Sequence, residues 1–126
     1  MRNKLFILLI AAVLFLSACS STPTVAPTPT LDPIAKQGQA VFNARCATCH
    51  ALVPDTIIIG PSLYGIATRA ETRVEGQDAY TYLLTSVMQP DAYLVQGYEN
   101  LMPNNLSKEL TGEELDAVVA YLQTLK

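Results

Sequence analysis

The stretch Cys46-Ala47-Thr48-Cys49-His50 decides how the rest of this sequence is interpreted. Two cysteines separated by two residues, with a histidine directly after the second, form the attachment pattern of a c-type haem. At the end of a helix the two sulfurs reach the two vinyl groups of the haem and become thioethers, and the imidazole of His50 then binds the iron. His50 is the single histidine of the chain, so no other imidazole can take that place. The pattern predicts one covalent haem c.

Two other kinds of site use cysteines at this spacing. A redox dithiol or disulfide of the thioredoxin type is expected within a βαβ pattern, which we do not find around Cys46 and Cys49. A zinc site needs a second pair of cysteine or histidine ligands, which the chain does not offer. The directly following histidine therefore favours haem attachment over both alternatives.

The first residues have the pattern of an export signal. Arg2 and Lys4 precede an apolar run from Leu5 to Leu16, which is too short for a transmembrane helix and has the length of a signal-peptide core. The run leads into Cys19 through a segment similar to the lipobox of bacterial lipoproteins. We therefore expect a signal peptide over residues 1–18 and a lipid on Cys19. An ordinary signal peptide or an uncleaved anchor is the alternative.

Residues 19–33 read as a lipidated cysteine followed by a tether, because residues 20–33 contain four prolines and four threonines and cannot form a core. These 14 residues could span about 40 Å at ~3.1 Å per residue, as a swinging arm or as a passive spacer. Removal of the signal would leave six of the eight basic residues against eleven acidic ones, a net charge of −5. That charge argues against nucleic acid and mildly favours a partner with a basic docking surface.

Residues 34–126 are expected to form the folded domain, with three main helices and a short one. Apolar spacing predicts a helix from Ile34 to Cys46, with Asp32-Pro33 as its entry signal, and a second over residues 77–88 with Tyr80 and Met88 on its apolar face. Residues 68–76 are charged, and we expect them to be exposed. Residues 60–66 read as a turn into a short helix, and residues 57–59, three isoleucines, as a wall near the haem. Thr111 and Glu114 have the form of a capping box that starts a last helix, which we expect to end at Lys126.

The sixth position of the iron needs a ligand, and methionine is a common partner of histidine in c-type cytochromes. Met88 lies on the apolar side of a predicted helix, where methionine usually fills a core. Met102 lies in an irregular segment and precedes Pro103, which stiffens the backbone behind it. We therefore predict Met102 as the sixth ligand.

Together these residues resemble class I monohaem cytochromes c over nearly all of residues 34–126. The resemblance rests on the Cys46–His50 motif, Gly60-Pro61, Met102-Pro103 and the last helix with Tyr121. Residues 88–103 are also similar to the cytochrome c domains fused to subunit II of haem-copper oxidases. No copper ligands or transmembrane hairpin precede the domain, so we expect it to be free-standing.

The resemblance implies an all-α cytochrome c fold whose first and last helices cross, with Gly38 and Phe42 meeting Tyr121. It also implies that the Pro61 carbonyl accepts a hydrogen bond from His50, which orients the ring. Tyr64, Arg69, Tyr93 and Tyr98 could approach the haem propionates, but for each of them we favour a role in surface or core packing.

The expected function is that of a membrane-tethered carrier of single electrons, whose iron cycles between Fe(II) and Fe(III) with His50 and Met102 bound. No acid–base pair is evident, so we expect neither an enzyme nor a small-molecule substrate. Expected partners are redox proteins, such as an upstream quinol-oxidising complex and a downstream oxidase or reductase. The expected location is the outer face of the cytoplasmic membrane or the periplasm. A gas-binding or sensing haem protein with a labile sixth ligand, and the electron-exit subunit of a larger oxidoreductase, are the alternatives.

Overall fold

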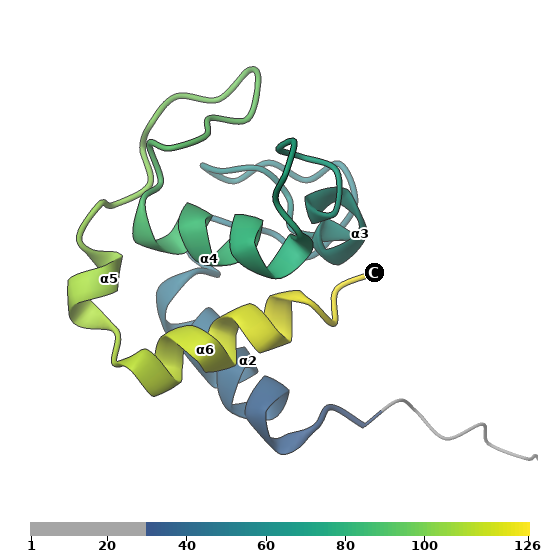
Figure 1. Cartoon of the computed structure of the whole chain (residues 1–126), viewed down its shortest axis with the longest axis vertical. Coiled ribbons are helices and arrows are strands. Elements are labelled where there is room, and N and C mark those ends of the chain that lie inside the picture. The colour runs from purple at the N-terminus through teal and green to yellow at the C-terminus, as the bar shows by residue number, and fades with distance from the viewer. Residues whose placement is uncertain (1–29) are drawn as a thin grey trace, which may run out of the picture. The chain divides into compact units, whose positions relative to one another are not determined.

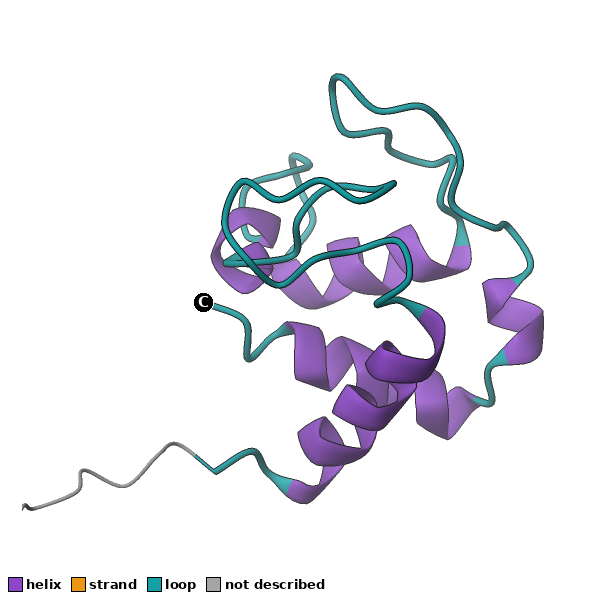
Figure 2. Ribbon diagram, turned by 180° about the vertical axis from the view of Figure 1, so that it is seen from behind, coloured by secondary structure: helices purple, strands orange, loops and turns teal. Residues whose placement is uncertain are grey.

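Helices provide all the regular secondary structure in residues 30–126, which are the residues that the computed structural model describes. Five helices and no strand occur in this part of the chain, as expected for an all-α fold (Figures 1 and 2). None of these helices is long and apolar enough to cross a membrane. The expected signal peptide, the lipid attachment at Cys19 and the tether up to residue 29 lie outside the described residues.

Helix α2, Pro33–Arg45, starts the domain one residue before the expected position. The Asp32 carboxylate caps it by accepting a 2.8 Å hydrogen bond from the backbone N–H of Ala35, and Pro33 occupies the first turn, where no donor is needed. Its buried face consists of Ala35, Gly38, Val41 and Phe42. The helix ends directly before Cys46, so its buried face also fixes the position of the segment that follows.

The first and last helices cross in close contact, as the resemblance implied (Figure 1). A Cβ atom at Gly38 would lie 1.8 Å from the backbone oxygen of Ala117 and 2.8 Å from the Cβ of Tyr121. Only glycine therefore permits this approach. The rings of Phe42 and Tyr121 meet beside it, with centroids 5.5 Å apart and planes inclined by 55°. The expected contacts of Gly38 and Phe42 with Tyr121 are confirmed.

Two helices lie in the middle segment of the chain and pack against each other. The short helix α3, Ile66–Ala70, begins after Gly65, which has a φ of 66° that glycine adopts without strain. Helix α4, Ala79–Met88, begins at Asp78, whose carboxylate accepts a 2.7 Å bond from the N–H of Thr81. α4 packs against α3 and α6, and these contacts enclose the core beside the Cys46–His50 segment.

The last helix, α6, spans Gly112–Leu122 and has the predicted capping box. The Thr111 hydroxyl accepts from the N–H of Glu114 at 3.2 Å, and the Glu114 carboxylate accepts from the N–H of Thr111 at 2.9 Å. The helix ends at Leu122 rather than at Lys126, because the N–H of Thr124 bonds to the oxygen of Tyr121 in a tight final turn. A second short helix that was not predicted, α5, Leu106–Glu109, precedes it.

One predicted apolar stripe, that of residues 77–88, is only partly buried. Tyr80 and Met88, expected on the buried stripe of residues 77–88, are each 40% exposed, whereas Tyr82, Leu83 and Val87 are buried. The phenol of Tyr80 reaches the exposed carboxylate of Asp116, 3.4 Å away, which explains its outward position. The buried stripe of α4 is therefore rotated from the expected one.

Candidate haem site

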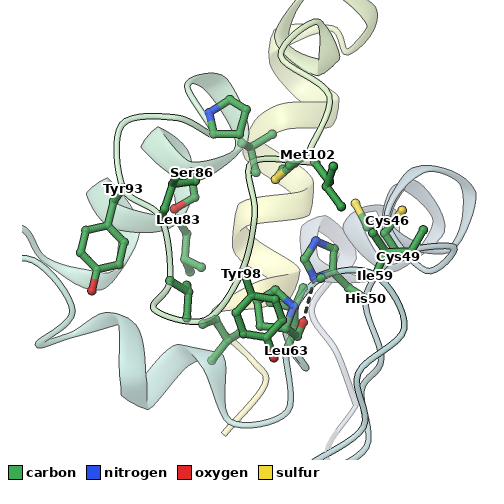
Figure 3. A pocket seen from close by; sticks show the side chains of 18 of the residues that line it. Cys46, Cys49, His50, Ile59, Leu63, Leu83, Ser86, Tyr93, Tyr98 and Met102 are labelled. Atoms are coloured by element: carbon green, nitrogen blue, oxygen red, sulfur yellow. Dashed lines mark hydrogen bonds between the residues drawn. The ribbon is translucent and has the colours of Figure 1, made fainter.

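The Cys46–His50 segment forms a tight turn on the end of α2. The N–H groups of Cys46 and Ala47 both donate to the oxygen of Phe42, at 2.8 and 3.0 Å, and those of Cys49 and His50 both donate to the oxygen of Cys46, each at 3.0 Å. This folding brings the side chains of Cys46, Cys49 and His50 to the edge of one cavity (Figure 3). The turn thus presents two thiols and one imidazole to the same space.

The two cysteines are half-buried, and neither forms a disulfide within residues 30–126. Burial, followed by the neighbouring Cys49, raises the pKa of the Cys46 thiol from its ordinary 9.0 to about 11. Reactive dithiols of the thioredoxin type have lowered thiol pKa values instead. Within residues 30–126 no group of three or more His, Cys, Asp or Glu side chains could hold a metal ion. The surroundings of Cys46 are those of a neutral sulfur beside an apolar cavity.

His50 is held by the loop that follows it. Its Nδ1 donates a hydrogen bond to the carbonyl oxygen of Pro61 at 2.8 Å, the contact that the resemblance implied (Figure 3). With Nδ1 donating, the proton-free Nε2 is left for a metal. The N–H groups of Ile59 and Gly60 bond to the oxygen of Cys49, at 3.2 and 2.9 Å, and tie this loop to the cysteine turn. These hydrogen bonds therefore hold the imidazole in one orientation.

Gly60 contributes a close approach that the sequence reasoning did not assign to it. A Cβ at this position would lie 2.4 Å from Cε1 and 2.9 Å from Nδ1 of His50. The backbone of Gly60 thus forms a flat support against one face of the imidazole ring. The sequence signal for this role was the position of Gly60 directly before Pro61, whose carbonyl accepts the hydrogen bond from His50.

The cavity has a volume of about 200 Å³, whereas about 10–15 Å³ suffices for one water molecule on the same measure. All five predicted residues of the haem site, namely Cys46, Cys49, His50, Pro61 and Met102, line it. Apolar side chains such as Leu63, Leu83 and Val87 provide much of the remaining wall. The cavity suits a large, mainly apolar group.

The structure brings one of the two candidate methionines to this cavity. Met102 is half-buried and enters the space into which His50 projects (Figure 3). Met88 is 40% exposed and is not among the lining residues. The loop that carries Met102 connects α4 with α5, so the sulfur comes from a different part of the chain than the imidazole.

Of the other residues that we predicted near the haem, some line the cavity and some do not. Of residues 57–59, only Ile59 lines it, while Ile57 and Ile58 are 66% and 51% exposed, so the prediction of a three-residue wall was wrong. The neighbouring backbone bonds to Cys49 begin only at Ile59, which leaves the two preceding residues on an outer turn. Tyr93 and Tyr98 line the cavity, whereas Tyr64 does not.

Arg69 and Arg73 also line the cavity, but they are bound differently. Arg69 donates to the backbone oxygens of Tyr64 and Ser62, the latter at 2.9 Å. The Nε of Arg73 is a buried nitrogen without a hydrogen-bond partner among residues 30–126. An unpaired cationic donor, two sulfurs and an oriented imidazole around an apolar space fit haem, which has an apolar ring, two vinyl groups and two carboxylates.

An all-helical domain with this thiol–imidazole turn defines the class of proteins that carry a covalent c-type haem. The family model described as cytochrome c matches residues 35–126, and the chain belongs to this family. Covalent haem c is therefore its cofactor, and the cysteines at 46 and 49 are those of the attachment motif. The cytochrome c domain implies electron transfer by this haem.

A curated relative is the cytochrome c-553-like protein of Synechocystis sp. (strain ATCC 27184 / PCC 6803 / Kazusa). The two are 40% identical over 62 residues, which amount to 49% of this chain and 58% of the relative. The match therefore covers less than two thirds of the relative's length.

Proposed function

We propose that this protein is a tethered carrier that moves single electrons between membrane-bound redox complexes. The observation that carries the proposal is the cavity that Cys46, Cys49 and His50 line from one part of the chain and Met102 from another. The bound haem supplies a one-electron Fe(II)/Fe(III) couple. The protein residues hold this group in one geometry and exclude water from its faces.

In this proposal Cys46 and Cys49 would form the two thioether bonds to the haem, and His50 and Met102 would bind its iron. The Pro61 carbonyl keeps the proton on Nδ1 of His50 and raises the basicity of Nε2. Leu83, Val87 and the other apolar lining residues keep the surroundings dry in both oxidation states. A fixed ligand pair and a dry cavity keep the reorganisation small when an electron arrives or leaves.

The proposed chain organisation is a signal peptide over residues 1–18, a lipid on Cys19 with a tether to residue 33, and the haem domain over residues 34–126. The lipid would hold the domain at the outer face of the cytoplasmic membrane or in the periplasm. Suitable partners are an upstream quinol-oxidising complex and a downstream oxidase or reductase. The similarity of residues 88–103 to the domains fused to oxidase subunit II supports an oxidase as the downstream partner. Co-purification with a catalytic partner would instead indicate that this chain is a permanent subunit of a larger oxidoreductase.

The test is the visible spectrum of the protein produced in a host that attaches haem c. We expect one haem per chain and, in the oxidised protein, the weak sulfur-to-iron charge-transfer band in the red, with loss of that band and a lower potential in Met102→Ala. Met88→Ala is the matched control and should keep the band, because Met88 lies outside the cavity. Binding of carbon monoxide by the reduced native protein at neutral pH would overturn the closed His–Met site and favour a gas-binding protein.

A further inference from the structure

The side chain of Arg73 contains an unexplained polar atom. Its Nε is the buried side-chain nitrogen or oxygen that has no hydrogen-bond partner in the part of the chain from residue 30 onward. Leaving a cationic donor buried and unpaired is costly, so native proteins pair almost all such groups. Arg73 lines the cavity, and it also lines a shallow outer depression with Arg69, Thr72 and Tyr93. The hydrogen-bond acceptor for Nε of Arg73 is therefore expected where the cavity meets the outer depression.

The neighbouring Arg69 shows by contrast what a structural arginine does here. Its Nη1 and Nη2 donate to the carbonyl oxygens of Tyr64 and Ser62, and its side chain is largely exposed. These bonds brace the backbone directly after Pro61. The guanidinium of Arg69 is thus occupied by the protein itself, which agrees with the packing role that we favoured for it from the sequence.

The other charged lining residues are also accounted for. Arg45 lies next to Cys46 and forms an ion pair with Glu109 at 3.3 Å. Glu99 carries a negative charge and would repel a carboxylate. Among the charged lining residues of the described chain, Arg73 is the cation with a buried donor still to be satisfied.

We infer that Arg73 donates from Nε to a propionate of the haem. This inference rests on the proposed haem site and adds a positioning residue to it. A haem brings two carboxylates into the cavity, and the guanidinium fork binds carboxylates with strong, charge-assisted hydrogen bonds. The pair fixes how far the ring enters the cavity, and it places a permanent positive charge near the iron.

The charge of Arg73 has a defined effect on the redox equilibrium. Its removal favours Fe(III), so Arg73→Gln should lower the equilibrium constant for reduction by roughly threefold to tenfold, where tenfold corresponds to ~59 mV for one electron. The pKa of the propionate should rise by about one unit or more, because an opposite charge close to it is lost. Reduction of the iron raises the pKa of the propionate, so this pKa is higher in the reduced than in the oxidised protein. Between these two pKa values the midpoint potential falls as the pH rises, and Arg73→Gln should move this pH interval upwards.

The experiment measures midpoint potential against pH for the haem-loaded protein and four variants. Arg73→Gln should show both shifts, and Arg73→Lys, which keeps a cation without Nε, should show smaller shifts in the same direction. Arg69→Gln tests the neighbouring arginine and should mainly lower thermal stability. Lys36→Gln removes one exposed charge of α2 away from the cavity and should change neither value.

An unchanged potential and interval in Arg73→Gln would overturn the inference. So would an Arg73→Lys variant that matches the wild type, or an Arg69→Gln variant that alone produces both shifts. A wild-type potential that responds to inorganic phosphate at constant ionic strength, with the response lost in Arg73→Gln, would assign Nε to a solution anion instead. Haem content and the red charge-transfer band are recorded for every sample. Their absence in the wild type would refute the proposed function, whereas their presence with an unchanged Arg73→Gln variant refutes this inference alone.

Discussion

The crossing of α2 and α6 makes a quantitative prediction for Gly38→Ala. The added methyl would lie 1.8 Å from the oxygen and 2.4 Å from the carbonyl carbon of Ala117. To move from 1.8 Å to the 3.4 Å at which ordinary contacts begin, the carbonyl must retreat by 1.6 Å. Because two of the three atoms in the way belong to the backbone, shortening a side chain of α6 cannot relieve the contact. The two helices must therefore separate.

Separation of the helices weakens the packing around them. Phe42 and Tyr121 are 1% and 4% exposed, and Val118 and Val119 are completely buried. A gap of 0.5–1 Å already forfeits about a quarter to a half of a van der Waals contact. We take the overpacking cost at or above the upper end of its usual range of about 1–3 kcal/mol. In a helix interior alanine is about 1 kcal/mol more favourable than glycine, so the net loss in the free energy of unfolding is about 2–3 kcal/mol.

The assay is thermal unfolding of the haem-loaded protein, followed by circular dichroism. A loss of this size should lower Tm by roughly 10–20 °C in a domain of this length. Gly112→Ala is the matched control, because Gly112 also lies in a helix of this pair but has no atom within 4 Å of its Cβ position. Its Tm should stay equal or rise slightly. If Gly38→Ala unfolded at the same temperature as Gly112→Ala, the close approach of the helices would be refuted.

Three further predictions concern the haem ligand and the helix caps. Gly60→Ala places a methyl 2.4 Å from Cε1 of His50, so haem should attach but the red band and the midpoint potential should change, and an unaltered spectrum would contradict the role of Gly60. Hydrogen bonds from Thr81, first of the side chain and then of the backbone, lower the pKa of Asp78 below its ordinary 3.8. The ionised Asp78 cap therefore stabilises the fold above pH 3.8, and this stabilisation is lost as the pH falls through the lower pKa of the folded state. The Tm of the wild type should drop relative to that of Asp78→Asn in this acid interval alone. Parallel curves of Tm against pH for the two proteins would contradict the prediction. Thr111→Ala removes the hydroxyl of the capping box and should cost ~1 kcal/mol, or about 4–8 °C in Tm, whereas Thr111→Ser should stay close to the wild type.

The features that the sequence predicted correctly depend on local chemistry or on a specific motif. Asp32 and Thr111 cap their helices because a side-chain oxygen three residues before an unpaired N–H can satisfy it, whatever the surroundings. The meeting of Gly38 with Tyr121 came instead from the family resemblance. Periodicity places a glycine on a buried face but does not identify the helix that approaches it.

The features that the sequence did not reveal depend on tertiary contacts. Tyr80 was expected inside because its spacing fits an apolar stripe, but its hydroxyl reaches Asp116 and turns the ring outward. Residues 68–76 were expected to be exposed because they are charged, yet Ala70 is completely buried and the Nε of Arg73 is enclosed. A charged segment predicts that its residues are exposed on average. Which single residue or atom of the segment is buried depends on the tertiary fold.

The pairing of α2 with α6 also has a consequence for biogenesis. Residues 38 and 117 are in contact although nearly the whole domain lies between them in sequence, so this interface cannot form until almost all of the chain is available. Contacts between such distant residues form late and slow down folding. During synthesis, Cys46 and Cys49 thus emerge on a segment whose main packing partner is still missing. The order of synthesis leaves both thiols open to the haem-attaching machinery before the helices close over them.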